Sequence, residues 1–89
     1  MMEEIISVVS GYTTVPAGEI TAESSFQDDL GFASIDSIAM MHEIENTFHI
    51  RLEDWERAYE LKTVSDLATL VEKLQQENTG EKETEDVSD

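Results

Sequence analysis

The sequence contains no cysteine and few basic residues, and each shortage excludes a kind of chemistry. Without a thiol, the chain can form neither a disulfide nor a thioester through its own side chains, which fits a reducing compartment. Five lysines and arginines stand against 21 aspartates and glutamates, giving a net charge of −16. Because nucleic-acid binding depends on basic groups that neutralise phosphates, this balance excludes nucleic acids and anionic membrane surfaces and favours basic protein partners.

Long hydrophobic runs are also missing. No apolar segment approaches the roughly 20 residues of a membrane-spanning helix. The N-terminal segment MMEEIISVVS is acidic where a secretion signal would be basic. With 89 residues and a hydrophobic fraction of 39%, the chain can build one small core. We therefore expect a single domain that does not insert into membranes and is located in the cytoplasm.

Three segments repeat apolar residues at the spacing of one helix face, which predicts amphipathic helices over residues 2–13 and about 35–48, and a last helix that begins after Thr63. The three stripes are Ile5, Val8, Val9 and Tyr12; Ile38, Met41, Ile44 and Phe48; and Leu67, Leu70, Val71 and Leu74. Thr63 precedes the last stripe and Asp66 follows three residues later, which is a capping-box pattern at a helix start. A shorter helical segment, residues 53–59, is too brief to be stable alone.

The stretch between the first two helices, residues 15–33, has no sustained period and holds the only proline. We expect Ile20, Phe26 and Leu30 to anchor this long loop to the core. No segment alternates as a strand would. The prediction is therefore an all-α domain over residues 1–76: a four-helix bundle with three main helices, one short helix and a long loop between the first and second. Residues 77–89 are polar and acidic, and we expect them to form a disordered tail.

Common catalytic and metal-binding patterns fail on spacing. The segment HEIEN has Asn46 where the zinc-protease helix motif needs a second histidine, and His42 and His49 have no third nitrogen or sulfur ligand. Ser34 has a glycine three residues before it, whereas a nucleophile elbow needs glycine two residues before and two after. We therefore predict no metal site and no enzymatic activity.

Ser34 comes directly before the second apolar stripe, where a serine usually serves as the helix N-cap. Its neighbours carry a more specific pattern. Residues 26–38 read FQDDLGFASIDSI, and residues 62–74 read KTVSDLATLVEKL. These stretches resemble the acyl carrier proteins, whose modification motif reads roughly (D/E)DLGxDSLDxV. The resemblance covers about residues 3–76.

The resemblance implies that Ser34 carries 4′-phosphopantetheine, joined to it by a phosphopantetheinyl transferase that uses Mg²⁺ and coenzyme A. The thiol of this arm would hold an acyl or aminoacyl group as a thioester and deliver it to partner enzymes with basic docking patches. Fatty acid and polyketide biosynthesis are among the possible pathways. The chain would be a monomeric carrier, and the missing cysteine fits because the cofactor supplies the sulfur. An unmodified acidic helical adaptor that binds basic proteins is the alternative.

By analogy with the family, two further sets of residues are candidates. The docking face would comprise Ile35, Asp36, His42, Glu45 and Asn46. The space between the second and last helices could accept the cargo, and its candidate lining is Ile38, Met41, Ile44, Leu61, Leu67 and Leu70. One position departs from the family pattern, because Ala33 stands where an aspartate usually precedes the serine. This departure leaves open which transferase modifies the chain.

Overall fold

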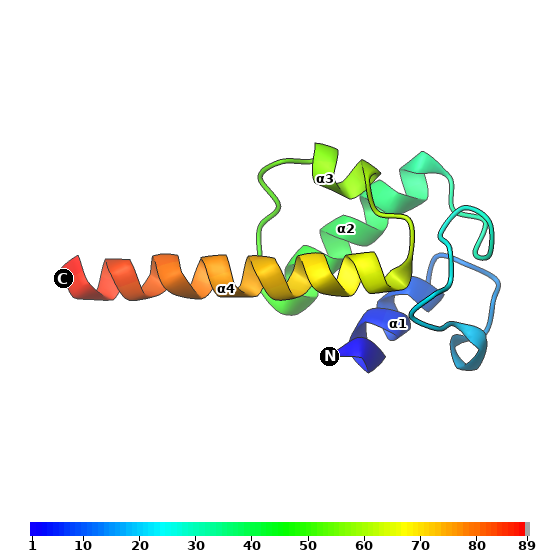
Figure 1. Cartoon of the computed structure of the whole chain (residues 1–89), viewed down its shortest axis with the longest axis horizontal. Coiled ribbons are helices and arrows are strands. Elements are labelled where there is room, and N and C mark those ends of the chain that lie inside the picture. Colours follow the sequence, from blue (N-terminus) through cyan, green and yellow to red (C-terminus); the bar gives the residue numbers. More distant parts are fainter. Residues whose placement is uncertain (89) are drawn as a thin grey trace.

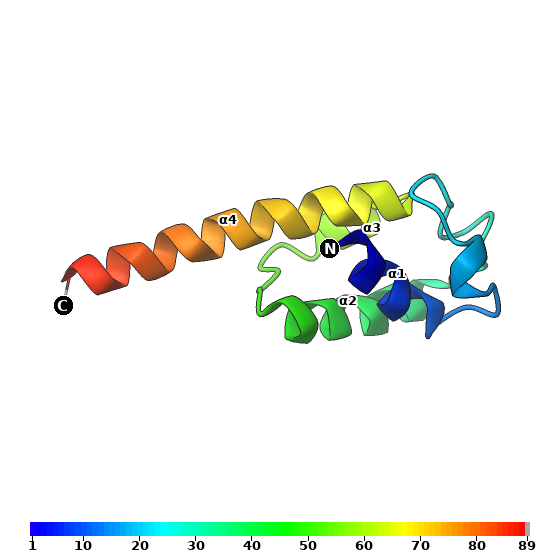
Figure 2. The same cartoon turned by 90° about the horizontal axis from the view of Figure 1, so that it is seen from below.

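The computed structural model describes the backbone of residues 1–88 and the side chains of residues 1–77. Its elements are α1 (Met2–Ser10), the 3-10 turn η1 (Ala17–Glu19), α2 (Ser34–Phe48), α3 (Glu56–Tyr59) and α4 (Val64–Ser88). Figure 1 shows the short α3 close to α2, and Figure 2 shows α2 and α4 on opposite sides of the bundle. The predicted all-α fold, with three main helices and one short helix, is confirmed.

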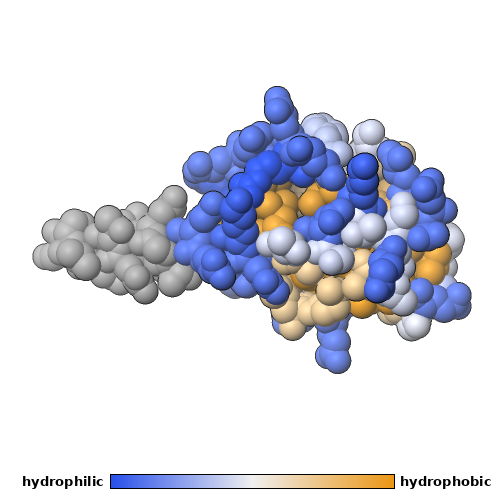
Figure 3. All heavy atoms as spheres, in the orientation of Figure 1, coloured by the Kyte–Doolittle hydropathy of each residue, from blue (hydrophilic) through white to orange (hydrophobic). Residues whose placement is uncertain are grey.

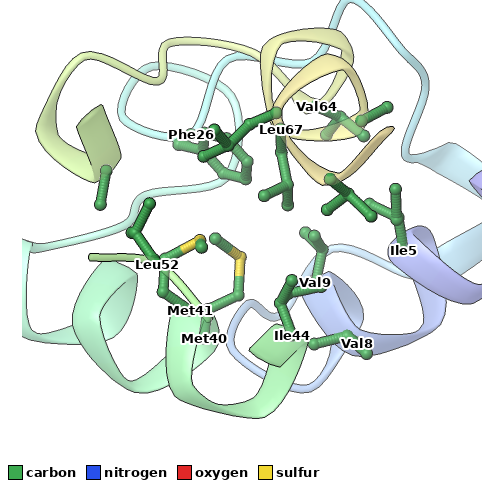
Figure 4. Close-up of a cluster of buried hydrophobic side chains, with 14 of the residues drawn as sticks. Ile5, Val8, Val9, Phe26, Met40, Met41, Ile44, Leu52, Val64 and Leu67 are labelled. Carbon is green, nitrogen blue, oxygen red and sulfur yellow. The ribbon is translucent and has the colours of Figure 1, made fainter. Parts of the chain in front are cut away.

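One hydrophobic core joins the three long helices. Ile5 and Val9 from α1, Met41 and Ile44 from α2, and Leu67 from α4 have no exposed surface. Figure 4 shows these side chains directed toward a common interior. Burial of a side chain of this kind stabilises the fold by about 1.5–3 kcal/mol. The stripes predicted for the first and last helices are therefore largely the buried faces of α1 and α4.

The buried face of α2 differs in part from the predicted stripe. Met41 and Ile44 are buried as expected, but Ile38 and Phe48 are only partly buried. Met40, which the sequence pattern did not single out, is 1% exposed. A helix turns by about 100° per residue, so the face that contains Met40 and Ile44 is rotated away from Ile38. Ile38 is consequently only half-buried, whereas Phe48 packs against the core.

The long loop before α2 is tied to the start of α4 by backbone hydrogen bonds. Phe26 N donates to Lys62 O at 2.9 Å, and Val64 N donates to Ser24 O at 3.1 Å. These contacts accompany an isolated bridge between Ser25 and Thr63, and the described residues contain no longer strand pairing. The three predicted anchors are all buried: Ile20, Phe26 and Leu30.

The first turn of α4 has the predicted capping box. Asp66 N donates to Thr63 Oγ1 at 3.3 Å, and Thr63 N donates to Asp66 Oδ2 at 3.1 Å. Lys62 N donates to the same carboxylate oxygen at 3.0 Å. The hydrogen bonds from the Lys62 and Thr63 amides lower the pKa of the Asp66 carboxyl. The N-terminus of α4 is therefore capped by hydrogen bonds among residues at the start of the helix itself.

The backbone of α4 continues to Ser88, beyond residue 76, where the end of the folded domain was expected. This helix extends past the other helices (Figure 1). The acidic side chains of residues 78–89 lie outside the described residues. The disorder expected of residues 77–89 in solution therefore stays a prediction. None of the described helices combines the length and the apolar character that a bilayer crossing requires.

Candidate functional site

Ser34 is the first residue of α2, and the N-cap position falls on Ala33. Ala33 has φ −91° and ψ 169°, the extended backbone conformation that an N-cap residue adopts. The usual N-cap role for a serine at this point is thus wrong for Ser34. Its side chain is exposed, and its hydroxyl forms no hydrogen bond within the described part of the chain. Ser34 Oγ is therefore an unengaged oxygen that faces solvent.

The backbone around Ser34 is held by residues on both sides of it. Asp36 Oδ2 accepts a hydrogen bond from Ala33 N at 2.9 Å, which is one half of a capping box. Ala33 cannot supply the other half because its side chain has no acceptor. Gly31 has φ 70°, a left-handed conformation that glycine adopts without the strain other residues incur. The glycine and Asp36 together set the direction in which the chain enters α2.

The segment before this glycine forms a compact turn. Ser25 N donates to Asp29 Oδ2 at 2.7 Å, and Asp28 N donates to Ser25 Oγ at 3.1 Å. Phe32 N donates to Phe26 O at 2.7 Å, and the centroids of these two rings are 5.2 Å apart. Of the two acids in this turn, Asp29 therefore has a structural role. The turn holds the residues that lead to Ser34 in one arrangement.

A small cleft of about 60 Å³ lies beside Ser34, between the start of α2 and α3. Its lining includes Phe32, Ser34, Ser37, Ala58, Tyr59 and Leu61. Leu61 is the only one of the six candidate cargo-lining residues that borders this cleft. Met41, Ile44 and Leu67 are instead packed in the core with no exposed surface. The cargo role of this set stays a prediction.

Some of the candidate docking residues are exposed, and others are half-buried and accept hydrogen bonds from the backbone. Ile35 is 73% exposed, and His42 and Asn46 are also exposed. Asp36 is half-buried and bonded to the backbone, as described above. Glu45 is half-buried too. On the face seen in Figure 3, several apolar patches lie between hydrophilic residues.

Glu45 joins α2 to the segment that follows it. Its Oε2 atom accepts a hydrogen bond from Leu52 N at 2.7 Å, and its Oε1 atom lies 3.5 Å from His42 Nδ1. The His42 ring in turn lies against Trp55, with centroids 4.9 Å apart. His49 ends α2 in the left-handed conformation, with φ 55°, so that the chain can turn back toward Glu45. This local network was not visible in the sequence pattern.

Glu43 is the remaining acid of α2. Its Oε1 atom accepts a hydrogen bond from the Tyr12 hydroxyl at 2.7 Å. This hydrogen bond to the carboxylate raises the pKa of Tyr12 above its ordinary value, with desolvation as a smaller contribution. The contact fixes the turn that follows α1 against α2. Among the described residues, no group of three or more histidines, aspartates or glutamates is arranged to hold a metal ion.

Comparison with known proteins extends the description of this site. A family model described as the phosphopantetheine attachment site matches residues 3–71. The acyl carrier protein of Porphyromonas gingivalis, in each of two strains, is 37% identical over 71 residues, which is 80% of this chain and 90% of the relative. The chain belongs to the acyl carrier protein family. A solved structure from Mycobacterium tuberculosis, provisionally described as an acyl carrier protein, matches with a TM-score of 0.67 and 34% identity, over 78% of this chain and 92% of that one.

Phosphopantetheine is the cofactor of this carrier family, and the residues at the start of α2 fit it. Attachment requires a hydroxyl that a modifying enzyme can reach, and Ser34 is exposed, with no hydrogen bond from its hydroxyl to the described part of the chain. Ser37, one turn later, is half-buried. The predicted family and cofactor are confirmed, whereas the roles of Ser34 and of the docking and cargo residues stay predictions.

Proposed function

We propose that this chain is an acyl carrier whose 4′-phosphopantetheine arm is attached as a phosphodiester to Ser34 Oγ. The observation that carries the proposal is the exposed, unbonded hydroxyl at the first residue of α2. When bound, the cofactor supplies a terminal thiol that holds an acyl or aminoacyl group as a thioester. The carrier presents this group, and we assign the chemistry to its partner enzymes.

The position of Ser34 favours an attached phosphate. The first backbone N–H groups of a helix lack partners within the helix, and the helix dipole is positive at this end. A phosphate on Ser34 would therefore lie in a favourable electrostatic environment. Asp36, the nearest acid along α2, accepts the Ala33 amide hydrogen and so keeps the backbone on either side of Ser34 in place.

The net charge of −16 suits partners with basic surfaces, because opposite charges accelerate encounter before any contact is made. We place the carrier in the cytoplasm as a monomer, on the sequence grounds given above. Its pathway could be fatty acid or polyketide biosynthesis. Entry of a long cargo between α2 and α4 would require Met41, Ile44 and Leu67 to repack, and the flexible methionine side chain is suited to such a change.

Intact mass spectrometry tests the proposal directly. The full chain is incubated with coenzyme A, Mg²⁺ and a broad-specificity phosphopantetheinyl transferase. We expect wild type and Ser37→Ala to gain one phosphopantetheine each, and Ser34→Ala to gain none. Circular dichroism would show that both variants are folded. If wild type gains no mass with any transferase, the proposal is wrong and the adaptor alternative is favoured.

A further inference from the structure

The small cleft beside Ser34 has a polar mouth and an apolar floor. Gln27, Ser34 and Tyr59 line it and are exposed, and none of their side chains is hydrogen-bonded within the described part of the chain. Two phenylalanines, Phe26 and Phe32, also line the cleft, but they are only 3% and 5% exposed. The exposed residues therefore mark the side that opens to solvent, and the two buried rings mark its inner end.

Phe32 is held firmly at this inner end. Its ring centroid lies 5.2 Å from that of Phe26 and 6.4 Å from that of Tyr12. Its backbone N–H donates to Phe26 O at 2.7 Å. Tilted aromatic pairs at such separations attract each other beyond the effect of the area that they bury. Phe32 therefore cannot turn aside without the loss of contacts to two other segments of the chain.

The volume of the cleft limits what it can hold. It measures about 60 Å³, whereas an apolar cavity of about 150 Å³ is the size that accepts benzene. Phe26 belongs to the same buried cluster as Met41 and Leu67, so the hydrophobic core lies behind the floor of the cleft (Figure 4). The cleft has room for only a few carbon atoms, and the aromatic floor separates these atoms from the core.

Two other features near Ser34 do not supply a long apolar space. A wider hollow of about 560 Å³ lies against the start of α2, but it is lined mainly by glycines and polar residues, with Leu30 as its only aliphatic side chain. An alkyl chain gains little there, because its stabilisation depends on the apolar surface removed from water. Displacement of α3 would widen the mouth of the cleft, but Phe26 N donates to Lys62 O at 2.9 Å and so ties the floor to the segment before α4.

We propose that Phe32 determines which cargo this carrier accepts: its ring closes the cleft, so that a short acyl group fits beside Ser34 and a long alkyl chain does not. The inference rests on the proposed function, because it concerns a group carried on a phosphopantetheine attached to Ser34. It goes further by naming the class of cargo and the residue that sets the limit. Phe32 occupies a position that the acyl carrier motif leaves unspecified, so the limit is a feature of this chain.

The test measures Tm for pairs of full-length carriers that differ only in their cargo. A purified broad-specificity phosphopantetheinyl transferase loads each variant from acetyl-coenzyme A or octanoyl-coenzyme A with Mg²⁺, and intact mass spectrometry establishes that loading is complete. Phe32→Ala and Phe32→Leu make the floor smaller. Phe48→Ala is the matched control, because Phe48 packs against the core at the other end of α2 and does not line the cleft. Comparing two cargoes on the same variant cancels the loss of stability that the substitution itself causes.

We expect the acetyl and octanoyl forms of wild type to melt within about 2 °C of each other, and likewise those of Phe48→Ala. The octanoyl form of Phe32→Ala should melt at least about 4 °C above its acetyl form, because the chain enters the space that the ring vacates. Phe32→Leu should show a smaller rise in the same direction, and it decides the test if Phe32→Ala does not fold. Nuclear Overhauser contacts between the octanoyl methyl group and core side chains should accompany the rise and be absent from wild type.

The inference is overturned if octanoyl raises the Tm of wild type as much as that of the Phe32 variants, or if neither Phe32 variant responds to cargo length. An equal rise in Phe48→Ala would also overturn it, since a loosened core alone would then explain the effect. A wild-type chain that gains no mass from either acyl-coenzyme A would instead overturn the proposed function, so the two failures are distinguishable.

Discussion

Ala33→Asp should stabilise the domain, because α2 begins at a residue that has no side-chain acceptor. Ala33 already has the extended φ and ψ, −91° and 169°, that a capping residue adopts. Replacing an aspartate or asparagine cap by alanine costs about 0.5–2 kcal/mol, so the reverse change should gain about 1 kcal/mol. Asp36 Oδ2 lies 2.9 Å from Ala33 N, and repulsion between the two carboxylates keeps the expected gain below the upper limit.

The gain can be measured by urea and thermal unfolding followed by far-ultraviolet circular dichroism. For a domain of this size, 1 kcal/mol corresponds to a rise in Tm of about 4–8 °C. Ala33→Asn separates the hydrogen bond from the added charge and should also stabilise. Ala39→Asp is the matched control in the exposed middle of α2, where it should destabilise by about 0.5 kcal/mol. If neither Ala33 variant raises the midpoint of unfolding, the assignment of Ala33 as an incomplete cap is refuted.

Three further predictions concern backbone strain, acid stability and net charge. Gly31→Ala should lower the free energy of unfolding by about 1–2 kcal/mol, because Gly31 has φ 70° and alanine is strained in this left-handed conformation. Gly18→Ala is the control, since Gly18 has no such φ, and an equal loss of stability in both variants would contradict this explanation. Because folding lowers the pKa of Asp66, its carboxylate stabilises the folded domain at pH values above its pKa in the unfolded chain, which is about 3.9. This stabilisation is lost as the pH falls through the pKa of Asp66 in the folded domain. Urea unfolding at successive pH values should thus show a larger loss for wild type than for Asp66→Asn, and parallel losses would refute the linkage. Moderate salt should raise Tm because a charge of −16 repels itself, and melting that is indifferent to salt would contradict this view of the surface.

Helical periodicity predicted the buried faces of α1 and α4 well, since each packs mainly through one regular stripe. It failed in part on α2, where Met40 is buried and Ile38 is not fully so. The chain after α2 turns back, and Figure 4 shows Leu52 with Met40 and Met41 in the interior. Burial on that side depends on contacts between segments that are not adjacent in sequence, which local spacing does not encode.

The position of Ser34 could be predicted because a short motif marks it. The hydrogen bonds of the nearby acids could be predicted only in part. Asp36 follows Ala33 by the three-residue spacing of a capping box, and this signal was available in the sequence. The bond between Glu45 and Leu52 depends on the left-handed conformation of His49, which the sequence did not indicate. The two acids that the resemblance placed on the docking face are therefore also parts of the scaffold.

The hydrogen bonds between the long loop and the first turn of α4 have a consequence for how the site can open. Phe26 N donates to Lys62 O and Val64 N donates to Ser24 O across this junction, and neither bond involves α3. The wall of the cleft formed by Ala58 and Tyr59 belongs to a helix of only four residues. Displacement of this short wall would widen the cleft without moving Ser34, the residue to which we propose that phosphopantetheine is attached. The hydrogen bonds that hold the long loop are thus separate from the helix that forms this wall of the cleft.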